Sequence, residues 1–205
     1  MNLKQLWEKL ARENSRYYIN SDKGRGITEE EFNQSGIEDY NRLILNDPLL
    51  PKGGTFLEIG CGTGRMTQFI RLGYTMVYGT DISGEMIRQG RERLQGMNVI
   101  LAETDGKTIP IPLSSIDVAF SYLVFQHMKD RNMVKKNFKE VHRVLKRGGI
   151  FKVLLRADPQ NTLKPWWAGV DYDEESAKNL YSPLGFHLIK SEKVKTYGLW
   201  LWLVK

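Results

Sequence analysis

The sequence has 205 residues, of which 41% are hydrophobic and 11% are aromatic, so it is long and apolar enough for one globular domain with its own core. Its single cysteine, Cys61, excludes a disulfide framework and a zinc site made of several cysteines, and we expect a reducing, cytoplasmic location and no bound metal. No apolar run reaches membrane-spanning length and the amino terminus carries no signal-peptide pattern, so we expect a soluble protein that is not exported.

The chain opens with helical patterns and no strand pattern. Apolar residues from Leu3 to Leu10 recur at helical spacing, and Thr28 with Glu31 forms a capping box at the start of a second helix that runs toward Leu45. We expect this opening segment to be a helical cap that packs on a sheet domain.

A glycine-rich stretch follows the cap. The apolar residues 56–59 predict a short buried strand, and Gly60, Gly62 and Gly64 interrupt the pattern before helical spacing resumes. Glycines permit positive φ and let a ligand approach the backbone, while the free amides of the new helix point at the loop. The third glycine comes one residue earlier than in the dinucleotide pattern G-x-G-x-x-G, and Glu58 would repel a phosphate but not an ammonium group. The stretch therefore favours a ligand that lacks phosphate.

Two further strands are expected at residues 76–80 and 98–102. Asp81 ends the first of them, 21 residues after Gly60, which is close to the spacing of a carboxylate that reaches ribose hydroxyls across a strand–helix–strand unit. Ser83 is placed to cap the helix that comes next. Because the glycine loop and Asp81 are spaced as one unit, we expect them to form one nucleoside site.

Residues 107–115 hold two prolines and predict an extended loop, after which 116–121 predicts the fourth strand. The stretch 122–128 leaves the carboxyl end of that strand, where open α/β sheets place their ligands. It contains His127, one of three histidines, which could act as a general base or only fix the loop through a hydrogen bond.

The last third of the chain is basic, since residues 129–205 hold 16 Lys and Arg but 8 Asp and Glu. A helix over 129–147 carries much of this charge, and its basic face is either a solvated surface or a patch for nucleic acid or an acidic partner. A Gly-Gly turn then leads to a fifth strand near 150–155 and a helix over 173–181. Two final strands, the second at 199–204, form an antiparallel hairpin.

Together these motifs resemble the class I S-adenosylmethionine-dependent methyltransferases, in particular the type 11 methyltransferase domain family. The glycine stretch matches their motif I, E/D-x-G-x-G-x-G, and residues 145–149 resemble their L-K-P-G-G element with Arg147 where proline is usual. The resemblance covers Gly54 to Lys205. It implies an α/β fold with a Rossmann-like, doubly wound sheet of seven strands, mostly parallel with an antiparallel last strand. It also implies a single domain over 1–205, with the helical cap at 1–50 and the Rossmann-like core at 54–205.

The resemblance implies S-adenosyl-L-methionine as the cofactor. Asp81 would hold its ribose and Asp105 its adenine amine, while Ile82 and Met86 would flank the adenine ring unless they only fill the core. The cofactor-binding candidates are Glu58, Gly60, Cys61, Gly62, Gly64, Asp81, Ile82, Met86, Thr104, Asp105, Gly106 and Tyr122.

For the methyl acceptor, the resemblance implies contributions from the cap, from the loop after the fourth strand and from the insertion after the fifth. The acceptor-site candidates are Tyr17, Tyr18, Gln126, Arg156, Trp166 and Trp167, and the candidate base is His127. Tyr17 and Tyr18 have the alternative of ordinary packing between cap and core.

The expected activity is in-line transfer of a methyl group from a sulfonium to an acceptor, with a small molecule favoured. Carbon-5 methylation of pyrimidines needs a cysteine nucleophile, and the single cysteine, Cys61, is locked in the glycine loop. Enzymes that methylate exocyclic amines of bases carry an N/D-P-P-Y/F motif, and residues 121–124 do not match it. Three alternatives stay open: a nucleic-acid or protein methyltransferase that uses the basic 129–147 helix, a non-catalytic binding protein, and an NAD-binding Rossmann protein. We expect no membrane partner. The acceptor and the oligomeric state cannot be predicted from the sequence.

Overall fold

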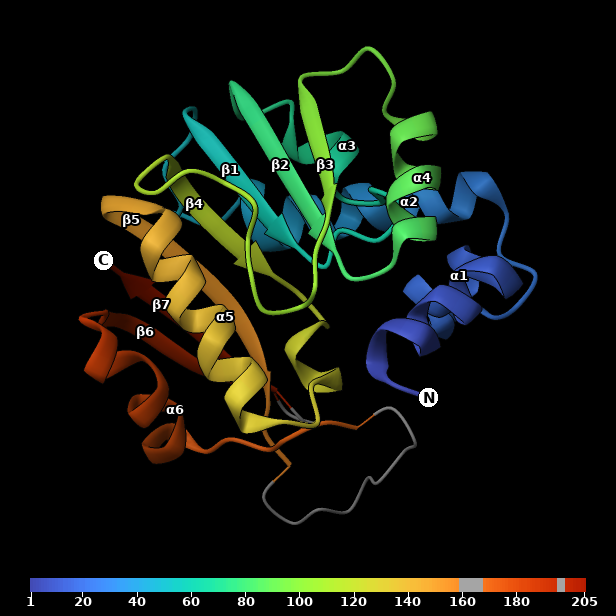
Figure 1. The fold of residues 1–205 in the computed structure, drawn as a ribbon. Helices are drawn as coiled ribbons and strands as arrows, with labels where there is room; N and C mark the ends of the chain where they lie inside the picture. Colours follow the sequence, from blue (N-terminus) through green and yellow to red (C-terminus); the bar gives the residue numbers. More distant parts are fainter. Residues whose placement is uncertain (159–167, 195–197) are drawn as a thin grey trace. The chain divides into compact units, whose positions relative to one another are not determined.

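The computed structural model describes residues 1–158, 168–194 and 198–205. The chain forms two compact units, Met1–Asp105 and Gly106–Lys205, and each is described by itself. The described residues contain the seven strands of a mixed sheet, drawn with their helices in Figure 1. The predicted division into a cap over 1–50 and a core from residue 54 stays a prediction.

The first unit holds a three-stranded parallel sheet in the order β3-β2-β1. Leu57 lies beside Tyr78, and Tyr78 lies beside Ile100, so the three strands end at the same edge. Helix α4 packs against β2 and β3 (Figure 1). The elements of this unit are α1 (Leu3–Ile19), η1 (Ser21–Lys23), α2 (Glu29–Tyr40), η2 (Asn41–Leu45), β1 (Thr55–Ile59), α3 (Thr67–Ile70), β2 (Met76–Asp81), α4 (Gly84–Arg93) and β3 (Val99–Glu103).

The starts of the first two helices are fixed by side-chain caps. The capping box expected for α2 is confirmed, since Thr28 Oγ1 accepts from Glu31 N at 3.2 Å and Glu31 Oε2 accepts from Thr28 N at 2.9 Å. That helix continues to Leu45 as expected, through the π-helical turn η2. Helix α1 begins at a further capping box on Asn2 and is interrupted by non-helical backbone at Asn14, so its last turn takes a new direction.

The second unit holds four strands in the order β4-β5-β7-β6. Strand β5 runs parallel to β4, whereas β7 runs antiparallel to both β5 and β6. The expected final hairpin and the reversed last strand are therefore confirmed. The elements of this unit are β4 (Ile116–Ser121), η3 (Phe125–His127), α5 (Arg131–Val144), β5 (Leu145–Arg156), α6 (Glu174–Tyr181), η4 (Ser182–Leu184), β6 (His187–Val194) and β7 (Gly198–Val204).

The basic helix is shorter than predicted. It ends at Val144, because Leu145 already pairs with Ile116 as the first residue of β5. The predicted Gly-Gly turn lies inside this strand: Gly148 has a φ of +78° and its N–H donates to Lys205 O at 2.8 Å. The helical periodicity ran on past the true end because it carries no information about this pairing with distant strands.

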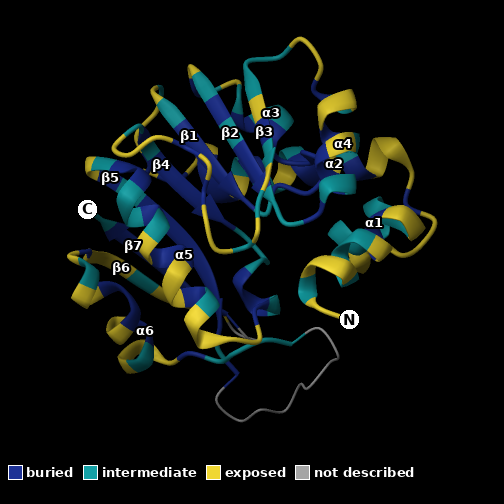
Figure 2. Cartoon of the chain, in the orientation of Figure 1, coloured by how far each residue is buried: buried dark blue, intermediate teal, exposed yellow. Residues whose placement is uncertain are grey.

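The two faces of the second unit's sheet differ in character. On the face covered by α5, the rings of Phe138 and Phe151 meet at a centroid distance of 5.3 Å. On the opposite face, Phe120, Lys152 and Trp202 lie in register across β4, β5 and β7. Figure 2 shows these strands buried and the outer surface of α5 exposed, so the core of this unit lies between its sheet and its helices.

Candidate functional site

The glycine loop after β1 adopts a conformation that only glycines accommodate easily. Gly62 has a φ of +55° and Gly64 a φ of +82°. A Cβ on Gly62 would lie 2.9 Å from Ile19 Cδ1, and one on Gly64 would lie 2.6 Å from Leu94 Cδ1. The loop is tied to the neighbouring strand, because Gly60 N donates to Thr80 O at 2.6 Å. The glycines therefore permit both the turn and its close packing.

Asp81 connects this loop to the end of β2. Its Oδ2 accepts from Gly62 N at 3.0 Å, and its Oδ1 accepts from Ser83 N at 2.9 Å. Burial raises the pKa of the Asp81 carboxyl, against the backbone N–H groups that lower it. The two motifs that the sequence spaced as one unit thus meet through one carboxylate, although their role in ligand binding stays a prediction.

Glu58 is a buried acid beneath the loop. Its side chain lies in β1, and its Oε2 accepts from Thr67 Oγ1 at 2.5 Å. Burial raises the pKa of Glu58 to about 7, although the Thr67 hydroxyl and the charge of Arg65 both act to lower it. Sequence reasoning missed these two partners. The signal for them was a carboxylate inside an apolar strand, which needs a donor.

Three other cofactor candidates are largely packed. Cys61 belongs to a core cluster with Ile87, Leu94 and Leu101, and burial raises its thiol pKa well above the ordinary value. Met86 is buried to 2% exposure, whereas Ile82 is half-buried. Core filling accounts for Cys61 and Met86, and direct contact of their side chains with a ligand stays a prediction.

The end of β3 brings two candidates next to the same carboxylate turn. Thr104 N donates to Asp81 O at 2.9 Å, and Asp105 follows it as an exposed residue. Glu103, the last residue of β3, forms an ion pair with Lys4 of α1. In the first unit, therefore, the loops after β1, β2 and β3 bring the candidates together at one edge of the sheet. Gly106, with a φ of +74°, begins the second unit.

Tyr17 and Tyr18 lie in the last turn of α1. Their rings meet edge to face at 4.8 Å, and the Tyr18 hydroxyl donates to Glu13 Oε1 at 2.9 Å. The guanidinium of Arg25 lies 5.0 Å from the Tyr17 ring. These contacts explain both tyrosines through packing within the first unit, and their contact with an acceptor stays a prediction.

The loop after β4 begins with a stacked aromatic residue, Tyr122, followed by a strained residue, Leu123. Tyr122 stacks on Trp200, with ring centroids 5.7 Å apart and planes 11° apart. The next residue, Leu123, has a φ of +58°, a left-handed conformation that costs a non-glycine residue about 1–2 kcal/mol. Such strain persists only where the surroundings hold it, often at binding sites, which agrees with the ligand-facing role expected for this loop.

The same loop carries Gln126 and His127 side by side. Gly169 N donates to Gln126 O at 2.6 Å, so the segment after the fifth strand supports this loop. The buried Gln126 side chain places its Nε2 3.3 Å from His127 Nε2. Because an amide nitrogen donates, His127 Nε2 accepts, and the neutral ring then carries its proton on Nδ1. The geometry supports the loop-fixing role of His127 and leaves its role as a base a prediction.

Arg156 ends β5 and is enclosed by acids. It is 2% exposed, and its guanidinium forms ion pairs with Asp158 at 3.0 Å and with Asp171. This enclosure favours a structural role over the predicted contact with an acceptor. The other two candidates from this insertion, Trp166 and Trp167, lie outside the described residues.

The described residues provide neither a metal-binding cluster nor a membrane-spanning helix. Within the described ranges, no three His, Cys, Asp or Glu side chains gather into a group able to hold a metal ion. In the same part of the chain, every helix is too short or too polar to cross a bilayer.

The chain is similar in sequence to known methyltransferases. A family model described as a methyltransferase domain matches residues 57–153. The chain is 30% identical over 112 residues to a malonyl-[acyl-carrier protein] O-methyltransferase of Hamiltonella defensa, covering 54% of this chain and 42% of that protein. It is 34% identical over 125 residues to the ubiquinone/menaquinone biosynthesis C-methyltransferase UbiE of Neisseria meningitidis, covering 56% and 48%. The chain thus spans less than half the length of these two relatives.

A solved structure shows the fold over most of the chain. The S-adenosylmethionine-dependent methyltransferase from Mesorhizobium loti superposes with a TM-score of 0.68 at 18% identity, covering 82% of this chain and 97% of that one. The Rossmann-like fold expected from the motifs is confirmed. The methyltransferase-domain model over residues 57–153, the methyltransferase relatives and this fold together support the class I S-adenosylmethionine-dependent methyltransferases as the family of this chain.

Proposed function

We propose that the protein transfers a methyl group from S-adenosylmethionine to a small-molecule acceptor. The observation that carries this proposal is the Asp81 carboxylate, which is bonded to Gly62 N–H on one side and Ser83 N–H on the other. Such a carboxylate, at the carboxyl end of the second parallel strand, is suited to accept hydrogen bonds from ribose hydroxyls.

The residues of the first unit suit this cofactor chemically. The positive φ of Gly62 and the tight packing of the loop leave backbone, rather than side chains, to meet a ligand. Asp81 places a carboxylate where a diphosphate would be repelled and an ammonium group attracted, and Glu58 would add to this effect when it is ionised. Glu58, Asp81 and Asp105 would hold the amino-acid, ribose and adenine parts respectively. S-adenosylmethionine, when bound, supplies the methyl group on its sulfonium.

In the second unit, the loop after β4 carries candidates for binding the acceptor. Gln126, whose backbone carbonyl accepts from the Gly169 N–H, would orient the acceptor, while Tyr122, held by stacking on Trp200, keeps its predicted role as a cofactor contact. His127 Nε2 would receive a proton only if the acceptor must lose one, as a hydroxyl or amine does, and only after Nε2 gives up the hydrogen bond from Gln126. A carboxylate or thiolate acceptor has no proton to lose, so it would leave His127 as a loop-fixing residue.

The names of two relatives favour a small acceptor group. The two relatives described above methylate a malonyl group on a carrier protein and a precursor in quinone biosynthesis according to their names, so they differ in the atom methylated. The shared part of the chain is therefore compatible with oxygen and carbon acceptors, and the acceptor itself is to be found by experiment.

Calorimetric titration tests the cofactor directly. Wild-type protein should bind S-adenosylhomocysteine and not NAD. Asp81→Ala should weaken that binding by about 2–3 kcal/mol, the scale of lost hydrogen bonds to a charged group. Asp81→Asn is the matched variant that keeps the shape, and melting temperatures identify variants that merely unfold. Binding of NAD in place of S-adenosylhomocysteine, or unchanged affinity for S-adenosylhomocysteine in Asp81→Ala, would overturn the assignment.

A further inference from the structure

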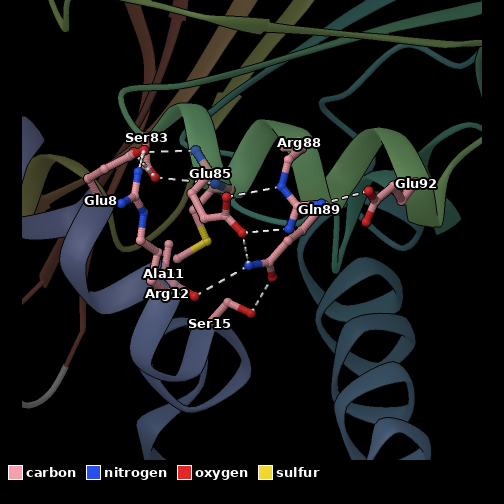
Figure 3. A network of polar contacts seen from close by, with 10 residues as sticks. Glu8, Ala11, Arg12, Ser15, Ser83, Glu85, Arg88, Gln89 and Glu92 are labelled. Atoms are coloured by element: carbon pink, nitrogen blue, oxygen red, sulfur yellow. Dashed lines mark hydrogen bonds and ion pairs between the residues drawn. The ribbon is translucent and has the colours of Figure 1, made fainter.

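Helix α1 is bound along α4 by a network of side chains, drawn in Figure 3. Glu8 Oε2 accepts from Ser83 Oγ at 2.7 Å and from Glu85 N at 3.3 Å. One turn further on, Gln89 Nε2 donates to Ala11 O at 3.3 Å. The amino-terminal helix therefore reaches the first turn of α4, which begins directly after Asp81 and Ile82.

Ser83 is the link between this network and the nucleoside site. Its Oγ accepts from Met86 N at 3.2 Å and donates to Glu8, so both capacities of the hydroxyl are used. Its backbone N–H donates to Asp81 Oδ1 at 2.9 Å. Asp81 in turn binds Gly62 N, and one continuous path of hydrogen bonds leads from Glu8 to the glycine loop.

Glu8 has the charge that this position favours. A carboxylate at the amino end of a ten-residue helix interacts favourably with the free N–H groups there. Partial burial acts to raise the pKa of Glu8, but the Ser83 and Glu85 hydrogen bonds and nearby Arg12 outweigh it and lower that pKa. Glu8 is therefore ionised near neutral pH and accepts both hydrogen bonds with a charged oxygen.

Neighbouring contacts keep Glu8 in register. Lys4, one turn earlier in α1, pairs with Glu103 at the end of β3. Ser15, two turns later, donates to Gln89 Oε1 at 2.7 Å. These anchors on both sides of Glu8 fix the position of α1 along α4 and so aim the carboxylate at Ser83.

We propose that Glu8 is a positioning residue for the ribose subsite. It holds Ser83, whose N–H orients the Asp81 carboxylate, without itself touching the ligand. The proposal rests on the proposed function, because it concerns how the same site grips a nucleoside. A residue of α1 would thus support the ribose subsite around Asp81.

A pair of ligands separates this role from a merely structural one. S-adenosylhomocysteine has both ribose hydroxyls, whereas its 2′,3′-dideoxy analogue lacks the groups that Asp81 would bind. Glu8→Ala should weaken binding of the first by about tenfold, the scale of one lost charge-assisted hydrogen bond, and change binding of the second by less than twofold. Glu8→Gln, which keeps an acceptor for the Ser83 hydroxyl, should lie between Glu8→Ala and wild type.

Glu13→Ala is the matched control, since Glu13 lies on the same helix but bonds to Tyr18 and Arg25. It should leave both affinities within twofold of wild type. Equal losses for the two ligands in Glu8→Ala, or no loss in either Glu8 variant, would overturn the positioning role while wild-type binding still supports the cofactor. Absence of wild-type binding would instead remove the proposed function.

Discussion

The two units of the chain build their candidate sites in different ways. In the first unit, backbone groups of consecutive loops meet around one carboxylate, as Gly62 and Ser83 do at Asp81. In the second unit, side chains are held by residues farther along the chain, as Arg156 is by Asp171 and Tyr122 is by Trp200. A site made of backbone geometry has a short sequence signature, whereas one made of long-range side-chain contacts has none.

The largest effect should come from breaking the second unit's buried ion pairs. Arg156→Ala would leave Asp158 and Asp171 without the guanidinium that neutralises them, and Asp158 is only 4% exposed. We expect the free energy of unfolding to fall by about 3–5 kcal/mol, because removing one member of a buried ion pair costs far more than losing a surface pair. Urea unfolding followed by circular dichroism measures the change.

Arg131→Ala is the matched control in this region. Arg131 stacks on Tyr172 at 4.9 Å and is exposed, so its removal should cost no more than about 1 kcal/mol. If Arg156→Ala kept the wild-type unfolding midpoint and lost only methyl transfer, Arg156 would be an acceptor contact after all, and the comparison between the units would fail.

The next effect tests the buried acid of the first unit. Glu58 has a folded pKa of about 7 against an ordinary value of 4.5, so the folded state keeps a proton that the unfolded chain releases between these values. The resulting stability is fully present below pH 4.5 and is lost as the pH rises through 7. From pH 4.5 to 8 the loss is about 3 kcal/mol.

Glu58→Gln should remove this pH dependence, because glutamine resembles the protonated acid and can still accept from Thr67. Unfolding midpoints at pH 5 and pH 8 measure it: the variant should match wild type at pH 5 and exceed it at pH 8. Glu30→Gln, an exposed position in α2, serves as the control. A wild-type protein equally stable at both pH values would show that Glu58 is ionised in the folded state.

Local motifs explain why the first unit could be predicted so far. The glycine spacing, the position of Asp81 and the Ser83 cap all act within a few residues of the chain or across one strand–helix–strand unit. Glu8 could not be predicted, because it meets Ser83 across 75 positions and an amphipathic pattern does not say which neighbour an acidic side chain will contact. Arg156 shows the same limit, since in the sequence it is indistinguishable from a substrate-binding arginine.

The smallest effect concerns the exposed face of α5, and it decides between the two acceptor classes. Lys135, Lys136 and Lys139 are exposed on the helix whose opposite stripe is buried. If this face is only solvated, replacing all three by Gln should change the free energy of unfolding by no more than about 0.5 kcal/mol per site and leave the affinity for S-adenosylhomocysteine unchanged. Wild type and variant should then bind a mixed-sequence RNA equally weakly at physiological salt, measured by fluorescence anisotropy.

Tight RNA binding that the three substitutions abolish would instead place the acceptor on this helix, because lost phosphate contacts weaken affinity for all sequences alike. Acceptor recognition would then depend on the exposed lysines of α5, and the small-molecule assignment would be wrong.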